Sequence, residues 1–122
     1  MRKATTEISL DTLKTSIIKG MQDKKANHIT SIDLRKLNNR LADMFIICHG
    51  SSDKQVEAIA ESVEREVFEA CKEKALHREG FENKEWILLD YFDIIVHVFE
   101  EEKRSFFALE NLWGDGEIEI HE

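Results

Sequence analysis

Asp90, Asp93 and His97 are polar residues within an otherwise apolar stretch, residues 86–99. Two carboxylates that hold a catalytic divalent metal on a strand must project from the same face, at positions i and i+2. Asp90 and Asp93 are three residues apart, and a turn separates the apolar runs on either side of them. The spacing therefore argues against a metal-dependent nucleotidyltransferase, an enzyme class that uses such a pair.

The remaining reactive residue types form no recognisable catalytic or metal-binding pattern. Cys48, His49 and His97 lack the spacing of a metal site, and no serine lies in a nucleophile elbow. The turn Gly50–Ser52 could cradle a phosphate through its backbone N–H groups. Its last residue, followed by Gln55 three positions later, has the capping-box pattern, which favours a plain strand-to-helix turn. We expect no enzymatic activity, no metal site and no cofactor.

Trp86 and Tyr91 begin and end the first apolar run. One interpretation is that both rings pack in the core under covering helices. The alternative is that they reach the surface beside Asp90, because aromatic anchors with a polar rim are typical of protein-binding hot spots.

Hydrophobic periodicity predicts the elements that position these residues. Two short runs rich in Val and Ile, 86–91 and 94–99, indicate neighbouring strands joined by a tight turn. Helices are predicted at 7–23, with Thr6 as N-cap, at 53–74, with Ser52 as N-cap, and at 101–113. Strands at 28–34 and 44–48 are expected to pair as a hairpin. Residues 75–85 read as a polar loop with Gly80 at positive φ, and 117–120 either add an edge strand or are disordered.

This order predicts an α/β fold in which a mixed sheet is sandwiched by helices. At 122 residues, the chain is long enough for one core only. We expect a single domain over residues 1–115, followed by an acidic C-terminal tail over 116–122.

Composition narrows the choice of partners. The net charge of −8 disfavours attraction to nucleic-acid phosphates, so we expect no direct sequence-specific nucleic-acid binding, and it suits a basic protein partner. Two cysteines without metal-type spacing are typical of free thiols in a reducing compartment. No apolar run reaches about 18 residues and no signal sequence is recognisable, so we expect a cytoplasmic protein with no membrane contact.

Three stretches resemble motifs of the ribosomal silencing factor family, RsfS, also called Iojap. They are Ala42-Asp43-Met44-Phe45-Ile46-Ile47-Cys48-His49-Gly50-Ser51-Ser52 with 56–60, then Glu79-Gly80 with 86–91 and 93–99, and finally 107–109 with 112–115. They follow the order and spacing of the family over about residues 8–115.

The resemblance implies a translational repressor. Family members bind the large ribosomal subunit through ribosomal protein fourteen, and their bulk blocks joining of the small subunit when nutrients are scarce. The resemblance also implies a nucleotidyltransferase-like topology, and because family members often form homodimers, a homodimer is a possible state. The partner-binding residues that it implies are Trp86, Leu88, Asp90, Tyr91 and Asp93. Two alternatives stay open, a nucleotidyltransferase-like enzyme and a dimeric scaffold that does not bind ribosomes.

Overall fold

The computed structural model describes residues 9–37, 42–107 and 116–121. In chain order the elements are α1 (Leu10–Asp23), β1 (Asn27–Asp33), β2 (Met44–Gly50), α2 (Asp53–Cys71), β3 (His77–Glu79), β4 (Trp86–Asp90), β5 (Ile94–Glu100), α3 (Glu101–Phe107) and β6 (Glu117–His121). The strands form one six-stranded sheet in the order β3-β4-β5-β2-β1-β6. β2 and β5 pair in parallel and the other neighbours pair antiparallel, which confirms the predicted mixed α/β fold.

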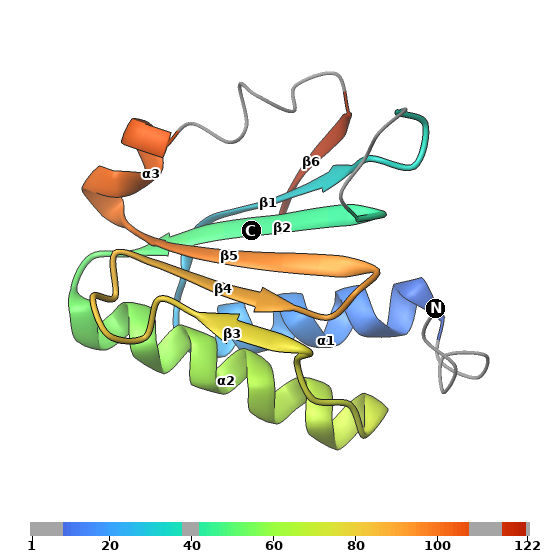
Figure 1. Ribbon diagram of the computed structural model, residues 1–122, viewed down its shortest axis with the longest axis horizontal. Helices are drawn as coiled ribbons and strands as arrows, with labels where there is room; N and C mark the ends of the chain where they lie inside the picture. The colour runs from blue at the N-terminus through green and yellow to red at the C-terminus, as the bar shows by residue number, and fades with distance from the viewer. Residues whose placement is uncertain (1–8, 38–41, 108–115, 122) are drawn as a thin grey trace.

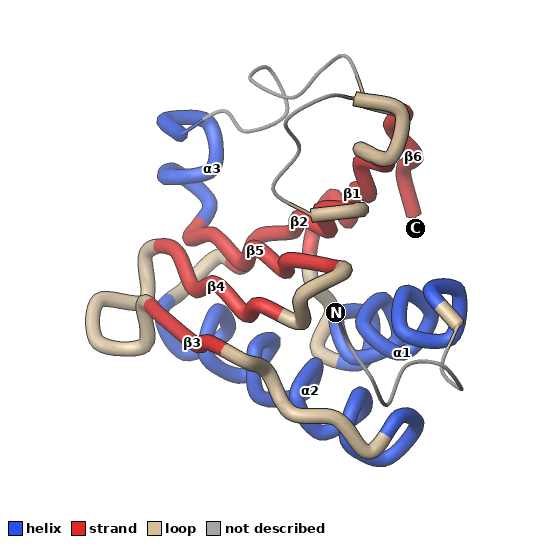
Figure 2. The backbone as a smooth tube through the Cα atoms, turned by 45° about the vertical axis from the view of Figure 1, so that its right-hand side comes forward, coloured by secondary structure: helices blue, strands red, loops and turns tan. Residues whose placement is uncertain are grey.

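The helices lie on both sides of the sheet. α1 and α2 pack against each other and cover one face, while α3 lies beyond the other face at the end of β5 (Figures 1 and 2). We call these the α1–α2 face and the α3 face. Successive side chains of a strand point to opposite faces, so each strand contributes to both.

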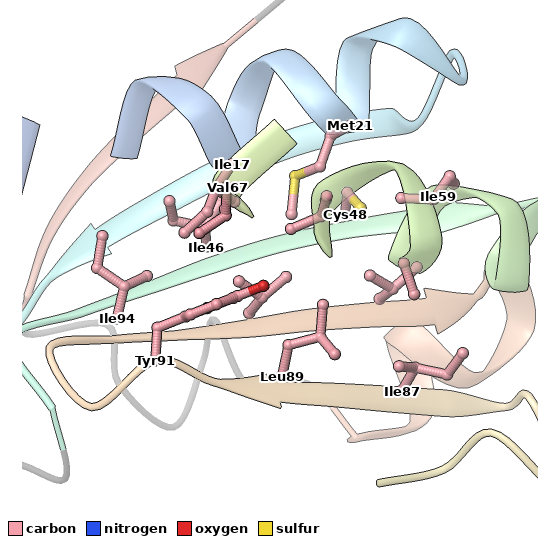
Figure 3. Close-up of a cluster of buried hydrophobic side chains, with 14 of the residues drawn as sticks. Ile17, Met21, Ile46, Cys48, Ile59, Val67, Ile87, Leu89, Tyr91 and Ile94 are labelled. Carbon is pink, nitrogen blue, oxygen red and sulfur yellow. The ribbon is translucent and has the colours of Figure 1, made fainter. Parts of the chain in front are cut away.

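The main core fills the space between the sheet and the two long helices (Figure 3). Aliphatic side chains from every layer are fully buried there, among them Ile17, Ile46, Ile59 and Leu89. Gly20 allows the close approach of the helices, because a Cβ at this position would lie 2.7 Å from the Cα of Val63. A side chain at residue 20 would therefore force α1 away from α2.

Two predicted helix limits were wrong. α1 begins at Leu10 and its N-cap is Ser9, whose hydroxyl accepts a hydrogen bond from the Thr12 N–H; the predicted cap, Thr6, lies outside the described residues. α2 has the predicted cap, Ser52, but ends at Cys71 rather than residue 74, because Lys72 adopts a left-handed conformation with φ 58°. No glycine marks this end in the sequence.

The predicted loop at 75–85 contains a short strand, β3, that the sequence did not indicate. All three of its residues are exposed, and β4 is its one neighbour among the described strands, so backbone pairing at the sheet edge forms it rather than burial. The last predicted helix is described as α3 over Glu101–Phe107, and its predicted residues 108–113 lie outside the described residues.

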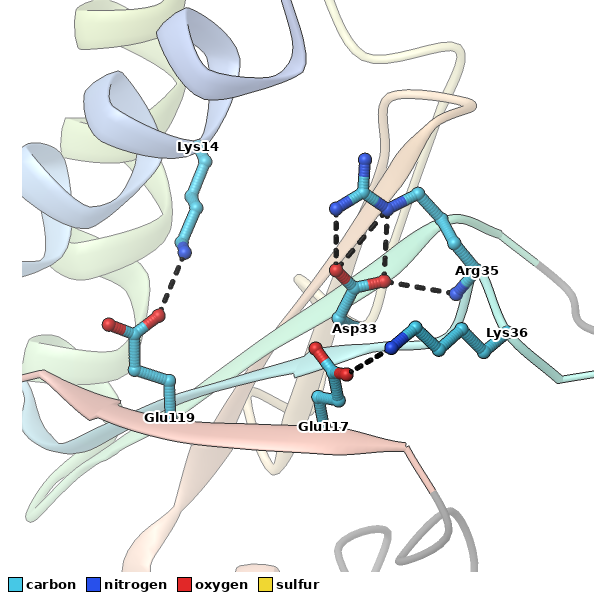
Figure 4. Close-up of polar contacts among 6 residues, drawn as sticks. All are labelled: Lys14, Asp33, Arg35, Lys36, Glu117 and Glu119. Atoms are coloured by element: carbon cyan, nitrogen blue, oxygen red, sulfur yellow. Dashed lines mark hydrogen bonds and ion pairs between the residues drawn. The ribbon is translucent and has the colours of Figure 1, made fainter.

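The acidic C-terminal segment forms the edge strand that was one of its two predicted states. β6 pairs antiparallel with β1, and its acidic side chains are tied to the body of the protein (Figure 4). Glu119 accepts from Lys14 Nζ at 3.0 Å and Glu117 from Lys36 Nζ at 2.9 Å. These exposed pairs are individually weak, and their role is to neutralise charge along an edge that is otherwise acidic.

Candidate protein-binding surface

β4 divides the predicted binding residues between the two faces of the sheet. Trp86, Leu88 and Asp90 alternate with buried neighbours and are half-buried on the α3 face. Tyr91 is different: its side chain is 2% exposed and packs in the core beneath the helices (Figure 3). Of the two interpretations of the aromatic pair, the structure places Trp86 at the surface and Tyr91 in the core, so Tyr91 is not available to a partner.

A neighbouring histidine holds the indole of Trp86. The Nε1–H of Trp86 donates to His97 Nδ1 at 3.0 Å, and the indole stacks on Phe99 with ring centroids 5.1 Å apart. Phe45 meets the His97 ring edge-on at 4.7 Å. The indole therefore keeps its polar group inside the protein and presents apolar carbon outward.

The hydrogen bond fixes the protonation state of His97. A nitrogen that accepts from an indole N–H carries no proton, so the proton of the neutral ring is on Nε2. Burial lowers the pKa of His97 to about 3, which keeps the ring neutral. Nε2 is buried and has no hydrogen-bond partner among the described residues, so this neutral state is maintained at a cost in stability.

Asp90 and Asp93 shape the turn between β4 and β5. A carboxylate oxygen of Asp90 accepts from the Phe92 N–H at 2.7 Å, which holds Phe92 at φ 72°. A bulky residue rarely adopts this left-handed conformation. The backbone carbonyl of Asp93 accepts from the N–H groups of Asp43 and Met44 at 2.9 and 3.1 Å. The turn is thus anchored at both aspartates, and the ring of Phe92 is left 44% exposed beside them.

Gly80 lies directly against the backbone of Trp86, the first residue of β4. Its φ is +89°, and a Cβ at this position would lie 2.0 Å from the carbonyl oxygen of Trp86. The prediction of a positive φ is confirmed. The close approach adds a second reason for glycine, because a larger residue would displace the backbone that carries the indole.

The arrangement offers no recognisable catalytic chemistry in the part of the chain that the structure describes. Within those residues, no group of three or more His, Cys, Asp or Glu side chains could hold a metal ion. Burial raises the pKa of the Cys48 thiol to about 12, so its reactive thiolate is not populated.

None of the described helices is long and apolar enough to cross a membrane. What the surface provides is a fixed aromatic anchor at the start of β4 and a carboxylate at its end.

Sequence reasoning missed two members of this surface. Phe92 lies in the turn, where no periodicity signals exposure, and only its left-handed backbone directs the ring outward. His97 reads as a core histidine in the sequence, and it is buried, but its role in holding Trp86 depends on the register that pairs Leu88 with His97 across two strands. A register is not readable from either strand alone.

Comparison with known proteins shows the family. The family model described as "Ribosomal silencing factor during starvation" matches residues 7–122. The chain therefore belongs to the ribosomal silencing factor family.

Individual relatives agree with this assignment. The chain is 42% identical to the Ribosomal silencing factor RsfS of Bacillus subtilis, over 79% of this chain and 80% of that protein. It is 32% identical to the chloroplastic protein Iojap of Zea mays, over 75% of this chain and 41% of that protein.

Solved structures show the same fold. A crystal structure of a Chromobacterium violaceum protein superposes with a TM-score of 0.82, at 33% identity and with 88% of each chain covered. One from Bacillus halodurans gives 0.74 at 34% identity, covering 84% of this chain and 94% of the other.

Proposed function

We propose that this protein is a translational repressor that binds the large ribosomal subunit through ribosomal protein fourteen and sterically blocks joining of the small subunit. Membership of the ribosomal silencing factor family supports a regulatory role at the ribosome. The observation that carries the binding proposal is the internally satisfied indole of Trp86, an apolar anchor on the same face of β4 as Asp90. The proposed action takes place in the cytoplasm, where the subunits meet.

The mechanism that we propose makes and breaks no covalent bond. Trp86 and Leu88 would supply the apolar centre of the interface, because buried aromatic anchors contribute most of the binding energy in such contacts. Asp90 and Asp93 would provide negative charge that suits a basic ribosomal protein and speeds association. An interface of about 800 Å² on each partner would suffice for a stable complex.

Preorganisation favours this surface over a flexible one. The indole is already held by the hydrogen bond to His97 and the ring stack on Phe99, so little side-chain entropy is lost when a partner covers it. Phe92 extends the proposed apolar area at the turn, where Asp90 holds its backbone. Tyr91 is left out of the proposed contacts because it is buried.

Sedimentation with separated ribosomal subunits tests the proposal. The protein should comigrate with large subunits alone on a sucrose gradient, and an excess should prevent formation of the joined ribosome when small subunits are added. Free joining at saturating protein would disprove the steric mechanism. Sedimentation equilibrium of the protein alone would test the homodimer, which remains a prediction.

A further inference from the structure

A second surface lies at the C-terminal end of α2, where cations surround an exposed aromatic ring. Phe68 is 45% exposed, and the ammonium groups of Lys72 and Lys74 lie over its ring, 5.6 and 5.9 Å from the centroid. Such contacts are favourable cation–π interactions. With Arg65, which is exposed one turn earlier on the helix, these residues form what we call the Phe68 patch.

Several cations elsewhere in the described part of the chain have carboxylate partners. Lys14, Lys36 and Arg78 are each paired with a carboxylate. By contrast, the side chains of Arg65, Lys72 and Lys74 form no hydrogen bond or ion pair with any residue that the structure describes. Lys24, Lys25 and Lys54, near the other end of α2, likewise form no ion pair among the described residues. What distinguishes the Phe68 patch is the exposed aromatic ring that its cations surround.

The patch borders a hollow of about 410 Å³ between α2 and the sheet edge. Its lining includes Arg65, Phe68 and Lys74, and the guanidinium of Arg78 closes one side by pairing with Glu64 at 2.7 Å. That pairing neutralises the one carboxylate in the lining. The hollow therefore offers cationic and aromatic groups to an incoming ligand.

The Phe68 patch lies on the α1–α2 side of the sheet, and one backbone contact links its segment to the end of β4 that carries Asp90. The backbone N–H of Leu76, a residue that is 61% exposed, donates to the carbonyl oxygen of Asp90 at 2.7 Å. Leu76 follows Lys74 by two residues, so the chain leads from the patch to the end of β4. A particle that presents a basic protein next to a polyanion would cover both surfaces by reaching around this edge of the sheet.

We propose that the Phe68 patch contacts ribosomal RNA of the large subunit when Trp86 engages the neighbouring ribosomal protein. Arg and Lys pair with backbone phosphates without reading sequence, and an exposed aromatic ring stacks on a base. An acidic protein is repelled by RNA overall, so a local group of unpaired cations is what allows close approach. This inference rests on the proposed function and adds a second partner to it.

Charge removal from the patch provides the test. The triple variant Arg65→Gln, Lys72→Gln, Lys74→Gln changes exposed side chains only and should fold normally. Its affinity for whole large subunits should fall about tenfold, and the dependence of log affinity on log salt should weaken by about 2. Its affinity for isolated ribosomal protein fourteen should not change.

A matched control removes the same charge at the far end of α2. Lys24, Lys25 and Lys54 lie near its N-terminus, where Gln55 bonds the carbonyl oxygens of Lys24 and Lys25. The corresponding triple glutamine variant should retain wild-type affinity for whole subunits. Equal losses in both variants would indicate a general charge effect and overturn the proposed patch.

Phe68 gives an independent measurement. Phe68→Ala should lower affinity for whole subunits about fivefold, while Phe68→Trp, which keeps a stacking ring, should retain it. Unchanged subunit binding in the triple variant and in Phe68→Ala would refute the RNA contact alone. Failure of the wild-type protein to bind large subunits would instead refute the proposed function, and this inference with it.

Discussion

The two faces of the sheet use the same strands but different chemistry. On the α1–α2 face, residues such as Leu89 and Val96 are aliphatic and fully buried. On the α3 face, their neighbours Trp86, His97 and Phe99 are aromatic and joined by a hydrogen bond and ring stacks. Aliphatic burial is non-directional and supplies stability, whereas a binding anchor must also be oriented. The comparison predicts that stability and binding can be changed separately from adjacent positions.

The largest effect is expected from Leu89→Ala on the α1–α2 face. Leu89 is fully buried, so the cavity should lower the free energy of unfolding by about 2–5 kcal/mol. Urea denaturation measures this. Leu88→Ala, one residue away on the α3 face and half-buried, should cost about 1 kcal/mol and weaken subunit binding instead. Similar stability losses at both positions would break the distinction between the faces.

Next in size is the effect of Trp86→Ala on binding. Loss of an aromatic anchor should weaken binding to isolated ribosomal protein fourteen by about 2 kcal/mol, or roughly 30-fold. Titration calorimetry measures this, after circular dichroism shows that the variant is folded. Trp86→Phe retains a ring but cannot donate to His97, so an intermediate loss is expected. Unchanged affinity in folded Trp86→Ala would assign the residue to packing alone.

The pH dependence of stability tests the state of His97. Its pKa is lowered to about 3 in the folded protein, against about 6.5 when unfolded. Below pH 6.5 the unfolded state therefore binds one more proton, and stability falls by about 1.4 kcal/mol per pH unit as the pH is lowered. His97→Phe should remove most of this slope between pH 6.5 and 5 in urea titrations, and a residual slope is expected from His121, whose pKa is also lowered by burial. His77→Gln, on the exposed strand β3, serves as the control and should preserve the slope.

The smallest expected effect concerns the charge of Asp90. Asp90→Lys should slow association with a basic partner a few-fold at low salt, and the difference should shrink as salt is added. Because Asp90 also holds the Phe92 N–H, Asp90→Asn is the matched variant that keeps an acceptor while removing charge. Stopped-flow kinetics would measure both. A defect that does not depend on salt would point to the turn rather than to electrostatic steering.

The sequence alone determined most of the elements and the class of fold. Periodicity located both long helices and the four central strands, since burial on one or both faces leaves a regular pattern. The cap at Ser52 and the positive φ of Gly80 were also readable, because local chemistry decides them. β3 could not be predicted from the sequence, because its exposed residues show no hydrophobic pattern and its backbone pairing with β4 is what forms it.

Only the tertiary structure decided which of Trp86 and Tyr91 is buried. Their spacing of five residues already places them on opposite faces of an extended segment, but the packing of α1 and α2 determines that the face of Tyr91 is the covered one. The hydrogen bond from Trp86 to His97 likewise joins residues of two separate strands. The cations around Phe68 lie at the end of α2, which the sequence did not mark. Periodicity reports which residues are apolar along one element. Which side chains meet depends on register and packing between elements, and these are properties of the whole fold.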